Sequence, residues 1–256
     1  MTSLRNRGTT IVVIGCGEIG RPIARLCSTA YEDVICINED TVVDYDRIGI
    51  SSVMHVCLPG NMPNFIDVVK DYVVKTNPEL VIVHSTTAPG TMNELADFVG
   101  VDHIVHSQVH GKHQGGKMLA DMLQHQKFVA ADSDIAATSA INHLKEIGFA
   151  EEKLVILPKL ISGELVKIFA TSLYALLIAY AQEIKRIGDQ HGLEYEVLAL
   201  FKNLKTSDFD FSTITPGVIG GHCLMQNISL LDKTHKTLFA EFIKKSNDLY
   251  KKENRK

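Results

Sequence analysis

The sequence predicts a protein of the α/β class, in which a doubly wound parallel sheet is followed by a smaller all-helical domain with a long central helix. A β-branched apolar strand at residues 10–14 runs directly into glycines, strand and helix patterns then alternate up to residue 158, and a long apolar helical pattern covers residues 160–191. Such alternation is typical of βαβ units. We therefore expect a dinucleotide-binding domain over residues 1–158 and a helical domain for dimerisation and substrate binding over residues 159–256.

The first strand leads into Gly15-Cys16-Gly17-Glu18-Ile19-Gly20. Strand, glycines and helix in this order match the dinucleotide-binding fingerprint of Rossmann-like sheets. Gly15 would permit the tight turn, Gly17 would let the backbone approach a pyrophosphate, and Gly20 would allow close packing of the helix that begins near Arg21. A glycine-rich turn without a ligand is the alternative, and the strand–turn–helix context argues against it.

The second strand, at residues 34–37, is followed by Asn38, Glu39 and Asp40. An acidic side chain about 20 residues after the fingerprint favours the ribose 2′-hydroxyl of NAD. A slightly shorter register would place the neutral Asn38 there, with Arg47 near enough to accept a 2′-phosphate. NAD is the favoured cofactor, and NADP stays open.

Further strands are expected at residues 53–58, 80–84, 104–105, 127–130 and 153–157, and helices at residues 65–76, 92–99, 118–123 and 135–147. The link over residues 41–52 is too short for a full crossover helix. Ligands bind at the carboxyl ends of the strands in such sheets. The residues expected to bind the cofactor are Gly15, Gly17, Glu18, Ile19, Gly20, Asn38, Glu39, Pro59 and Ser85.

The pattern over residues 160–191 is apolar on nearly all sides, so it must be buried, and a second copy of the chain is a plausible cover. This predicts a homodimer. The most apolar portion, residues 172–181, is too short to span a bilayer. Further helices are expected at residues 194–205 and 236–252.

Composition places the 256-residue chain among ordinary globular proteins, with 45% hydrophobic and 22% charged residues. The net charge of −4 argues against nucleic-acid binding. Neither a signal peptide nor a membrane span is evident, which predicts a soluble, cytoplasmic protein. Cys16, Cys27, Cys36 and Cys57 are expected to be buried, reduced residues of the core and not disulfides.

Four segments resemble the UDP-glucose/GDP-mannose dehydrogenase family in the right order. They are Arg21-Pro22 after the fingerprint, the loop at residues 85–91 (Ser-Thr-Thr-Ala-Pro-Gly-Thr), residues 164–171 (Glu-Leu-Val-Lys-Ile-Phe-Ala-Thr), and Gly220-Gly221-His222-Cys223. The resemblance covers most of the chain. It implies an NAD-dependent enzyme that oxidises a sugar alcohol twice, to a carboxylate.

The resemblance also implies roles for individual residues. Cys223 would add to the aldehyde formed by the first oxidation, and a second hydride transfer would leave a thioester. Lys167 would stabilise a developing oxyanion or alkoxide, and Thr86 would position a water or the substrate hydroxyl. Thr171 and Asn227 occupy the positions of the family's asparagine and aspartate and complete the expected catalytic set.

The chain departs from the family pattern at these last two positions and at Ser107-Gln108-Val109, where the family has Ser-Pro-Glu. Thioester hydrolysis is the step most affected, because two carboxylates that would activate water are replaced. No counterpart of the family's C-terminal nucleotide-sugar domain follows the cysteine segment.

Histidines gather where the family's glutamate is missing. Because His103 and His106 lie an odd number of residues apart on a strand, they face opposite ways, and no metal site is expected. A site for an anionic substrate, or for a general base, is expected from the polar side chains beyond the strand and beside the cysteine: His110, Lys112, His113 and His222.

Three functions are compatible with these residues. The first is a dehydrogenase for a sugar or nucleotide sugar that acts through Cys223. The second is a single-step enzyme of the 3-hydroxyacid dehydrogenase type, with Lys167 as acid and base. The third is a non-catalytic dinucleotide-binding protein. The expected partners are a small-molecule substrate and a second copy of the chain, without nucleic acid or membrane.

Overall fold

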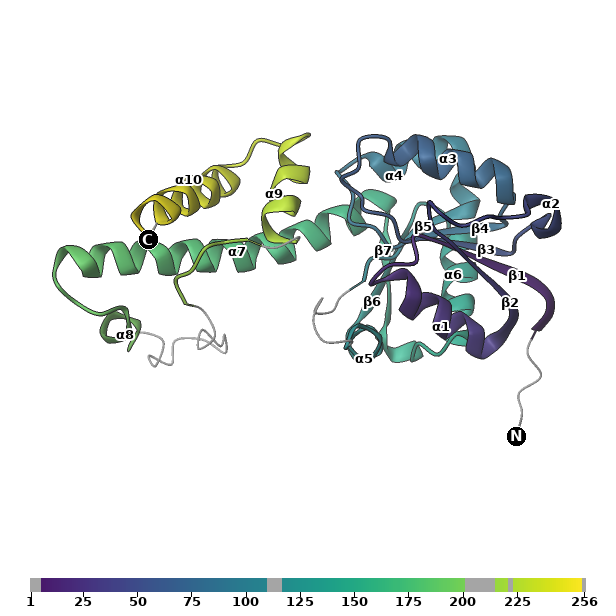
Figure 1. The fold of residues 1–256 in the computed structure, drawn as a ribbon, viewed down its shortest axis with the longest axis horizontal. Coiled ribbons are helices and arrows are strands. Elements are labelled where there is room, and N and C mark those ends of the chain that lie inside the picture. The colour runs from purple at the N-terminus through teal and green to yellow at the C-terminus, as the bar shows by residue number, and fades with distance from the viewer. Residues whose placement is uncertain (1–5, 110–116, 201–214, 221–222, 255–256) are drawn as a thin grey trace. The chain divides into compact units, whose positions relative to one another are not determined.

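The computed structural model describes residues 6–109, 117–200, 215–220 and 223–254. The chain forms two compact units, Met1–Lys167 and Ile168–Lys256. The first unit is built on a seven-stranded sheet in the order β2-β1-β3-β4-β5-β6-β7 (Figure 1). Its strands are β1 Asn6–Ile14, β2 Tyr31–Ile37, β3 Val53–Val56, β4 Leu80–Val83, β5 Ile104–His106, β6 Lys127–Ala131 and β7 Leu154–Pro158.

Strands β2, β1, β3, β4 and β5 are mutually parallel. The direction reverses once, where β6 pairs antiparallel with β5, and β7 then runs parallel to β6. The predicted α/β class and Rossmann-like architecture are confirmed, with a sheet that is mostly and not wholly parallel. Strands β3, β4 and β5 are buried along their whole length, which explains their mostly apolar sequences.

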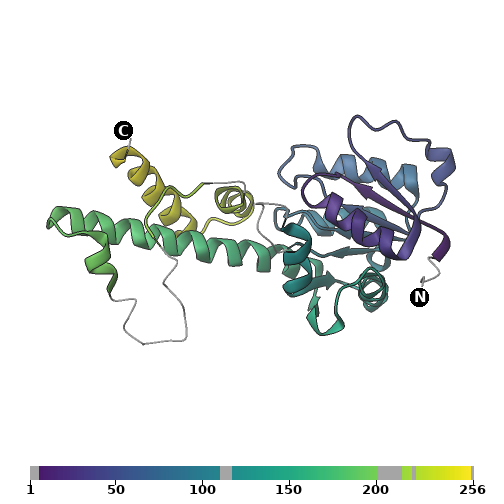
Figure 2. The same cartoon turned by 60° about the horizontal axis from the view of Figure 1, so that its bottom comes forward.

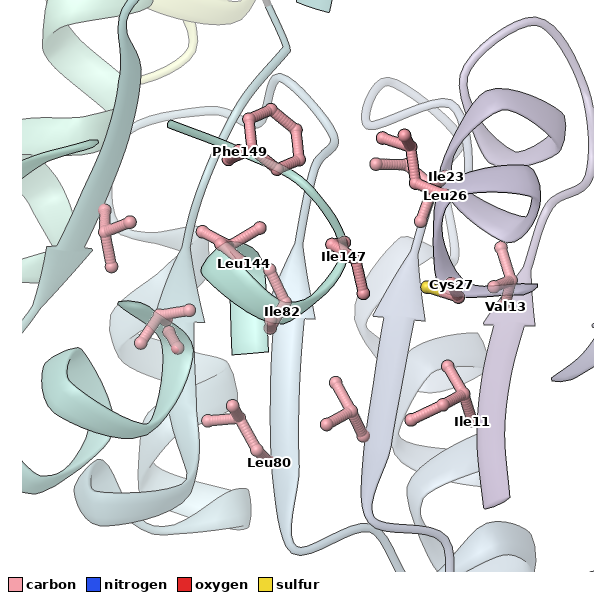
Figure 3. Close-up of a cluster of buried hydrophobic side chains, with 14 of the residues drawn as sticks. Ile11, Val13, Ile23, Leu26, Cys27, Leu80, Ile82, Leu144, Ile147 and Phe149 are labelled. Carbon is pink, nitrogen blue, oxygen red and sulfur yellow. The ribbon is translucent and has the colours of Figure 1, made fainter. Parts of the chain in front are cut away.

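Helices cover both faces of this sheet. They are α1 Gly20–Ala30, α2 Tyr45–Ile48, α3 Phe65–Thr76, α4 Thr91–Val99, α5 Met118–Gln124 and α6 Asp134–Glu146. Side chains of α1, α5 and α6 share one apolar core with the sheet, and those of α2, α3 and α4 share the other. Figure 3 shows the first core, in which Cys27 of α1 lies beside Val13 of β1, and Leu144 of α6 lies over Ile82 of β4. The short α2 is the abbreviated crossover that the sequence predicts.

The second unit contains most of helix α7, Leu160–Gln190, with α8 Tyr195–Leu198, α9 Leu224–Asp232 and α10 Leu238–Glu253. Helix α10 runs beside α7, as Figures 1 and 2 show, and Ser246 donates a 2.9 Å hydrogen bond to Gln182 Oε1. Asn247 ties the preceding segment to this pair, because it accepts from the amide of Ile219 at 2.8 Å and donates to its carbonyl at 2.9 Å. Helix α9 was not predicted, and the last part of the helix expected at residues 194–205 lies outside the described residues.

Helix α7 has 31 residues, and its most apolar 18-residue window has a mean hydropathy of 1.5. By length and composition alone it is therefore long enough to cross a membrane, contrary to the expectation drawn from residues 172–181. The core helix of a soluble protein meets the same criterion. On this helix Ala175 and Ala179 are fully buried, whereas Phe169, Leu173 and Tyr180 are about half exposed.

Candidate active site

The glycine-rich turn after β1 has the geometry of a phosphate-binding turn. Gly15 has a φ of +84°, and a Cβ there would lie 2.8 Å from the carbonyl oxygen of Cys57. A Cβ at Gly20, the first residue of α1, would lie 2.2 Å from the Gly15 oxygen. At Gly17, by contrast, nothing lies within 4 Å of the Cβ position. Two glycines are thus needed by the fold, while the third faces open space where a ligand can approach the backbone.

Asn38 connects the end of β2 to this turn. Its side-chain Oδ1 accepts a 2.7 Å hydrogen bond from the backbone amide of Cys16. Its backbone amide donates to the Thr41 hydroxyl at 2.9 Å. Glu39 and Asp40 are exposed beside it. The candidate ribose-binding residues therefore lie next to the glycine turn, where the sequence predicts them.

Cys16 and Cys36 form a disulfide, with Cα atoms 6.0 Å apart. The expectation of reduced cysteines is wrong for this pair. Cys36 is paired with Val13 across β1 and β2, and the turn after Ile14 returns Cys16 to the same place. Cα atoms at this separation can be bridged without moving the backbone. The disulfide joins the glycine turn to the strand that precedes Asn38, whereas Cys27, Cys57 and Cys223 are free.

The loops after β3 and β4 lie against each other at the carboxyl edge of the sheet. A Cβ at Gly60 would lie 2.0 Å from the carbonyl oxygen of Thr86. Ser85 donates a 2.6 Å hydrogen bond to the carbonyl of Leu58, and His106 Nε2 lies 2.9 Å from the Ser85 oxygen. Thr86 is half-buried, and Pro59 directly follows Leu58.

Glu164 fastens the first turns of α7 to the loop before α4. Its fully buried carboxylate accepts from the Thr87 hydroxyl at 3.0 Å, from the amide of Gly90 at 2.7 Å and from the amide of Met92 at 3.0 Å. Thr87, Gly90 and Met92 belong to or follow the segment that resembles the family's Ser-Thr-x-x-Pro-Gly-Thr loop. Two of the four segments of the resemblance are thus joined by one carboxylate.

Lys167 lies one helical turn after Glu164. Its ammonium donates a 2.9 Å hydrogen bond to the carbonyl of Val109, just beyond the carboxyl end of β5. This contact is made to a backbone carbonyl, and the side chain at position 109 is apolar where the sequence resemblance implies a glutamate. The structure places Lys167, Thr86 and the glycine turn in the first unit.

Cys223, Asn227 and Thr171 are brought together in the second unit. Cys223 caps the N-terminus of α9, and its carbonyl accepts from the amide of Asn227 at 3.0 Å. The Asn227 side chain is buried and donates to the Thr171 hydroxyl at 2.9 Å, which in turn donates to the carbonyl of Ile168 at 2.9 Å. Two of the departures from the family pattern, Thr171 and Asn227, are therefore hydrogen-bonded to each other.

The predicted substrate-binding residues His110, Lys112, His113 and His222 lie outside the described residues. Of the two histidines on the preceding segment, His103 is exposed and its Nδ1 lies 2.9 Å from the Glu79 oxygen. His106 is buried, and burial lowers its pKa to about 4. Among the described residues His106 Nδ1 has no hydrogen-bond partner, and Gly163 of α7 lies close to it, since a Cβ added there would be 2.9 Å from Nδ1.

A row of buried polar side chains crosses the core on the face of the sheet that α1 and α6 cover. The sequence did not predict it. It runs from Tyr31 through His143, His55 and His84 to Lys127. Burial, followed by the neighbouring histidines, lowers the pKa of His55 well below its usual range, and burial lowers that of His143 to about 4. The available signal was that His55 and His84 occupy core-facing positions of apolar strands.

Lys127 is expected to make the stability of the first unit depend on pH. Its buried ammonium donates to the carbonyls of Ser107 at 2.5 Å and Gln108 at 3.0 Å, and burial lowers its pKa to about 7. The folded chain then binds this proton more weakly than the unfolded chain, so the free energy of unfolding should rise from about pH 7 to about pH 10, by at most about 1.4 kcal/mol per pH unit.

Urea denaturation at several pH values would measure this slope. Lys127→Met should flatten it, whereas Lys153→Met, which removes an ammonium that donates to the carbonyl of Leu123, serves as the control. If the free energy of unfolding of Lys127→Met rose with pH as steeply as that of the wild type, Lys127 would not be the source of the pH dependence.

Comparison with known proteins finds similar folds and one matching family model. Residues 162–249 match the model of the central domain of the UDP-glucose/GDP-mannose dehydrogenase family. The structure resembles the UDP-D-ManNAc dehydrogenase of Pyrococcus horikoshii with a TM-score of 0.78 at 19% identity, covering 94% of this chain and 69% of that one. It also resembles the NDP-N-acetyl-D-galactosaminuronic acid dehydrogenase of Methanosarcina mazei Go1, with a TM-score of 0.76 at 17% identity, covering 96% and 68%.

A third similar structure is the 3-hydroxyisobutyrate dehydrogenase of Mycobacterium tuberculosis, with a TM-score of 0.69 at 14% identity, covering 95% of this chain and 93% of that one. A comparison with curated protein sequences finds no match. The fold is a Rossmann-like, mostly parallel sheet, followed by a helical domain that contains most of a long helix. Over residues 162–249 the chain is similar to the central domain of the UDP-glucose/GDP-mannose dehydrogenase family, in agreement with the resemblance found in its sequence.

Proposed function

We propose that the chain is a nicotinamide-dinucleotide-dependent oxidoreductase that acts on the CH–OH group of a sugar or a nucleotide-sugar-like alcohol. The observation that carries this proposal is the position of Lys167. Its ammonium is held at the Val109 carbonyl, beyond the end of β5, by a helix that Glu164 anchors to the loop before α4. Ligands of such sheets bind at this edge, where a fixed cation acts strongly on developing negative charge.

The glycine turn would hold the cofactor. The open face of Gly17 and the start of α1 fit a pyrophosphate, whose charge the helix N-terminus favours. Asn38 uses its Oδ1 on the Cys16 amide, which leaves its Nδ2 for a ribose hydroxyl. With Glu39 exposed beside it, NAD is favoured, and a 2′-phosphate would have to lie near this acidic side chain. When bound, the nicotinamide supplies the hydride acceptor.

The residues of the chain would handle the remaining charges and protons. As hydride leaves the alcohol carbon, Lys167 stabilises the alkoxide, and the hydroxyl proton passes to water positioned by Thr86. In a two-step oxidation, the thiolate of Cys223 adds to the aldehyde, loss of a second hydride gives a thioester, and water releases a carboxylate and the thiol. The Thr171–Asn227 pair offers no carboxylate for this last step.

A single oxidation is the second candidate, and a specific observation favours it. The Thr171–Asn227 pair offers no carboxylate for thioester hydrolysis, a step that a single oxidation does not require. In that case Lys167 acts as acid and base and Cys223 is structural. A chain that binds the dinucleotide without catalysis is the third candidate, motivated by the replaced carboxylates.

We also infer a cytoplasmic homodimer formed through α7. Apolar side chains that are about half exposed recur along this helix at intervals of four and seven residues, at Phe169, Leu173, Tyr180 and Ile187. Such spacing places them on one stripe of the helix, and an uncovered apolar stripe is unfavourable in water. A second copy of the same helix is the simplest cover.

The experiment that tests the function counts the NADH formed per molecule of limiting substrate. UDP-glucose, GDP-mannose and small 3-hydroxyacids would be compared in the wild-type chain and in Cys223→Ala, with Cys57→Ala as the matched control because Cys57 is also a free thiol. We expect about two NADH per nucleotide sugar, and loss of the second in Cys223→Ala.

One NADH per 3-hydroxyacid, with full activity in Cys223→Ala, would support the single oxidation and contradict the thioester route. Dinucleotide binding without turnover of any of these alcohols would contradict both oxidations.

A further inference from the structure

The buried polar row in the first unit has a centre where three metal-binding atoms meet. Cys27 Sγ, His55 Nε2 and His143 Nε2 all lie within 4.8 Å of one another, and all three residues are buried. His55 Nε2 is 2.9 Å from His143 Nε2 and 3.5 Å from Cys27 Sγ. The two histidine nitrogens can share a hydrogen bond only if one of them carries a proton. The tautomers of His55 and His143 are fixed by their partners on the outer side, towards Lys127 and towards Tyr31 with its acceptor Glu146.

From the Lys127 end, the protons point away from the centre. His84 Nδ1 lies 2.6 Å from the carbonyl oxygen of Ser107, which can only accept, so Nδ1 carries the proton. His84 Nε2 must then accept, and its partner at 2.9 Å is His55 Nδ1. Lys127, 3.1 Å from His84 Nδ1, already donates to two carbonyls. His55 therefore carries its proton on Nδ1 and turns a bare Nε2 lone pair towards the centre.

From the Glu146 end, the protons again point away from the centre. The Tyr31 hydroxyl donates to the exposed Glu146 carboxylate in a short hydrogen bond, so its oxygen is free to accept. The partner is His143 Nδ1 at 3.0 Å, which must donate. His143, like His55, then presents a bare Nε2 lone pair to the centre.

Two lone pairs at 2.9 Å repel each other unless something positive lies between or beside them. The thiol proton of Cys27 can serve only one of the two nitrogens. An imidazolium is unfavourable because the site is fully buried. A metal ion bound by both nitrogens and by the thiolate satisfies all three atoms at once, and deprotonation of Cys27, whose pKa burial raises to about 12, accompanies its binding.

We propose that Cys27, His55 and His143 bind one thiophilic metal ion, zinc(II) or copper(I), inside the core of the first unit. Two imidazoles with one thiolate are ligands that both ions accept. Zinc–nitrogen bonds of about 2.0–2.1 Å in tetrahedral geometry would open the distance between the two nitrogens to about 3.3 Å, a small ring movement. Copper(I) with one thiolate gives a neutral site, which suits three ligands in an apolar core.

The partners behind the two histidines fit this proposal. Ligating imidazoles commonly donate their second N–H to a hydroxyl, carboxylate or carbonyl chain that fixes the tautomer. Here His143 is held by Tyr31 and Glu146, and His55 by His84 and the Ser107 carbonyl. This metal site is separate from the proposed active site. The glycine turn lies at the start of α1, whereas Cys27 lies near the end of that helix.

The test measures metal binding by the full chain under anaerobic conditions without a reductant, so that the Cys16–Cys36 disulfide stays formed. Zinc(II) and copper(I) would be titrated separately against competing chelators, and cobalt(II) would report a bound thiolate by its charge-transfer absorption. We expect about one ion per chain in the wild type and in Cys57→Ser and Cys223→Ser, and loss of that ion with the cobalt–thiolate band in Cys27→Ser.

Tyr31→Phe provides a second variant in which all three ligands remain. It removes the hydroxyl that accepts from His143, so the affinity should fall about 10- to 100-fold while the fold, checked by circular dichroism, persists. A wild-type chain that retains no ion, or equal binding in Cys27→Ser and Cys57→Ser, would overturn the proposal. If Cys27→Ser does not fold, an unchanged affinity in Tyr31→Phe overturns it.

Discussion

Glu164→Ala is expected to lower the free energy of unfolding of the first unit by about 3–5 kcal/mol. The carboxylate is fully buried and accepts from the Thr87 hydroxyl and from the amides of Gly90 and Met92. Alanine leaves all three donors buried without an acceptor, and each unsatisfied donor costs about 1–3 kcal/mol. Chemical denaturation followed by circular dichroism would measure the loss.

Glu183→Ala on the same helix is the matched control. Glu183 pairs with Arg186 in a partly exposed ion pair, which is worth about 0–1 kcal/mol. The loss of unfolding free energy in Glu164→Gln should lie between those of the two alanine variants. The glutamine oxygen can still accept a hydrogen bond, while its NH₂ group faces further donors. A loss in Glu164→Ala no larger than that in Glu183→Ala would mean that the carboxylate does not hold α7 to the loop before α4.

Gly20→Ala is expected to destabilise the first unit by about 3 kcal/mol or more and to abolish dinucleotide binding, because it overpacks the start of α1. The added Cβ would lie 2.2 Å from the backbone oxygen of Gly15, which cannot rotate away as a side chain could. Helix α1 would have to move off β1, and the turn that would hold the pyrophosphate would open with it.

Gly17→Ala separates the fold from the ligand. Nothing lies within 4 Å of the Cβ position at Gly17, so the melting temperature should stay near that of the wild type. The same methyl group would occupy the space of the approaching pyrophosphate, and the affinity for NADH should fall about 10- to 100-fold by calorimetric titration. Wild-type affinity in Gly17→Ala would remove the support for a cofactor at this turn.

The elements of the first unit could be predicted because each has a local signature. The apolar runs that became β3 and β4 and the periodic pattern of α3 report burial that is determined within a few residues. The turn after β1 needs glycines for its backbone conformation, as the positive φ of Gly15 shows. Helix α9 gave no comparable signal, because it has only nine residues and follows a glycine segment.

The contacts that could not be predicted are all long-range. Cys16 and Cys36 are separated by 20 residues, and only the pairing of β1 with β2 brings them together. His55 and His143 are 88 residues apart, and each taken singly fits an apolar pattern as an ordinary core residue. The hydrogen bond between Asn227 and Thr171 likewise shows two unrelated departures from a family pattern to be one local change.

The polar row from Tyr31 to Lys127 also constrains how the chain can evolve. Each member fixes the tautomer of the next, so the effect of replacing His84 depends on what occupies positions 55 and 143. Substitutions in such a network are strongly non-additive. A single substitution in the row is therefore expected to be deleterious even where a double substitution is neutral. Related chains should keep these residues together or lose them together.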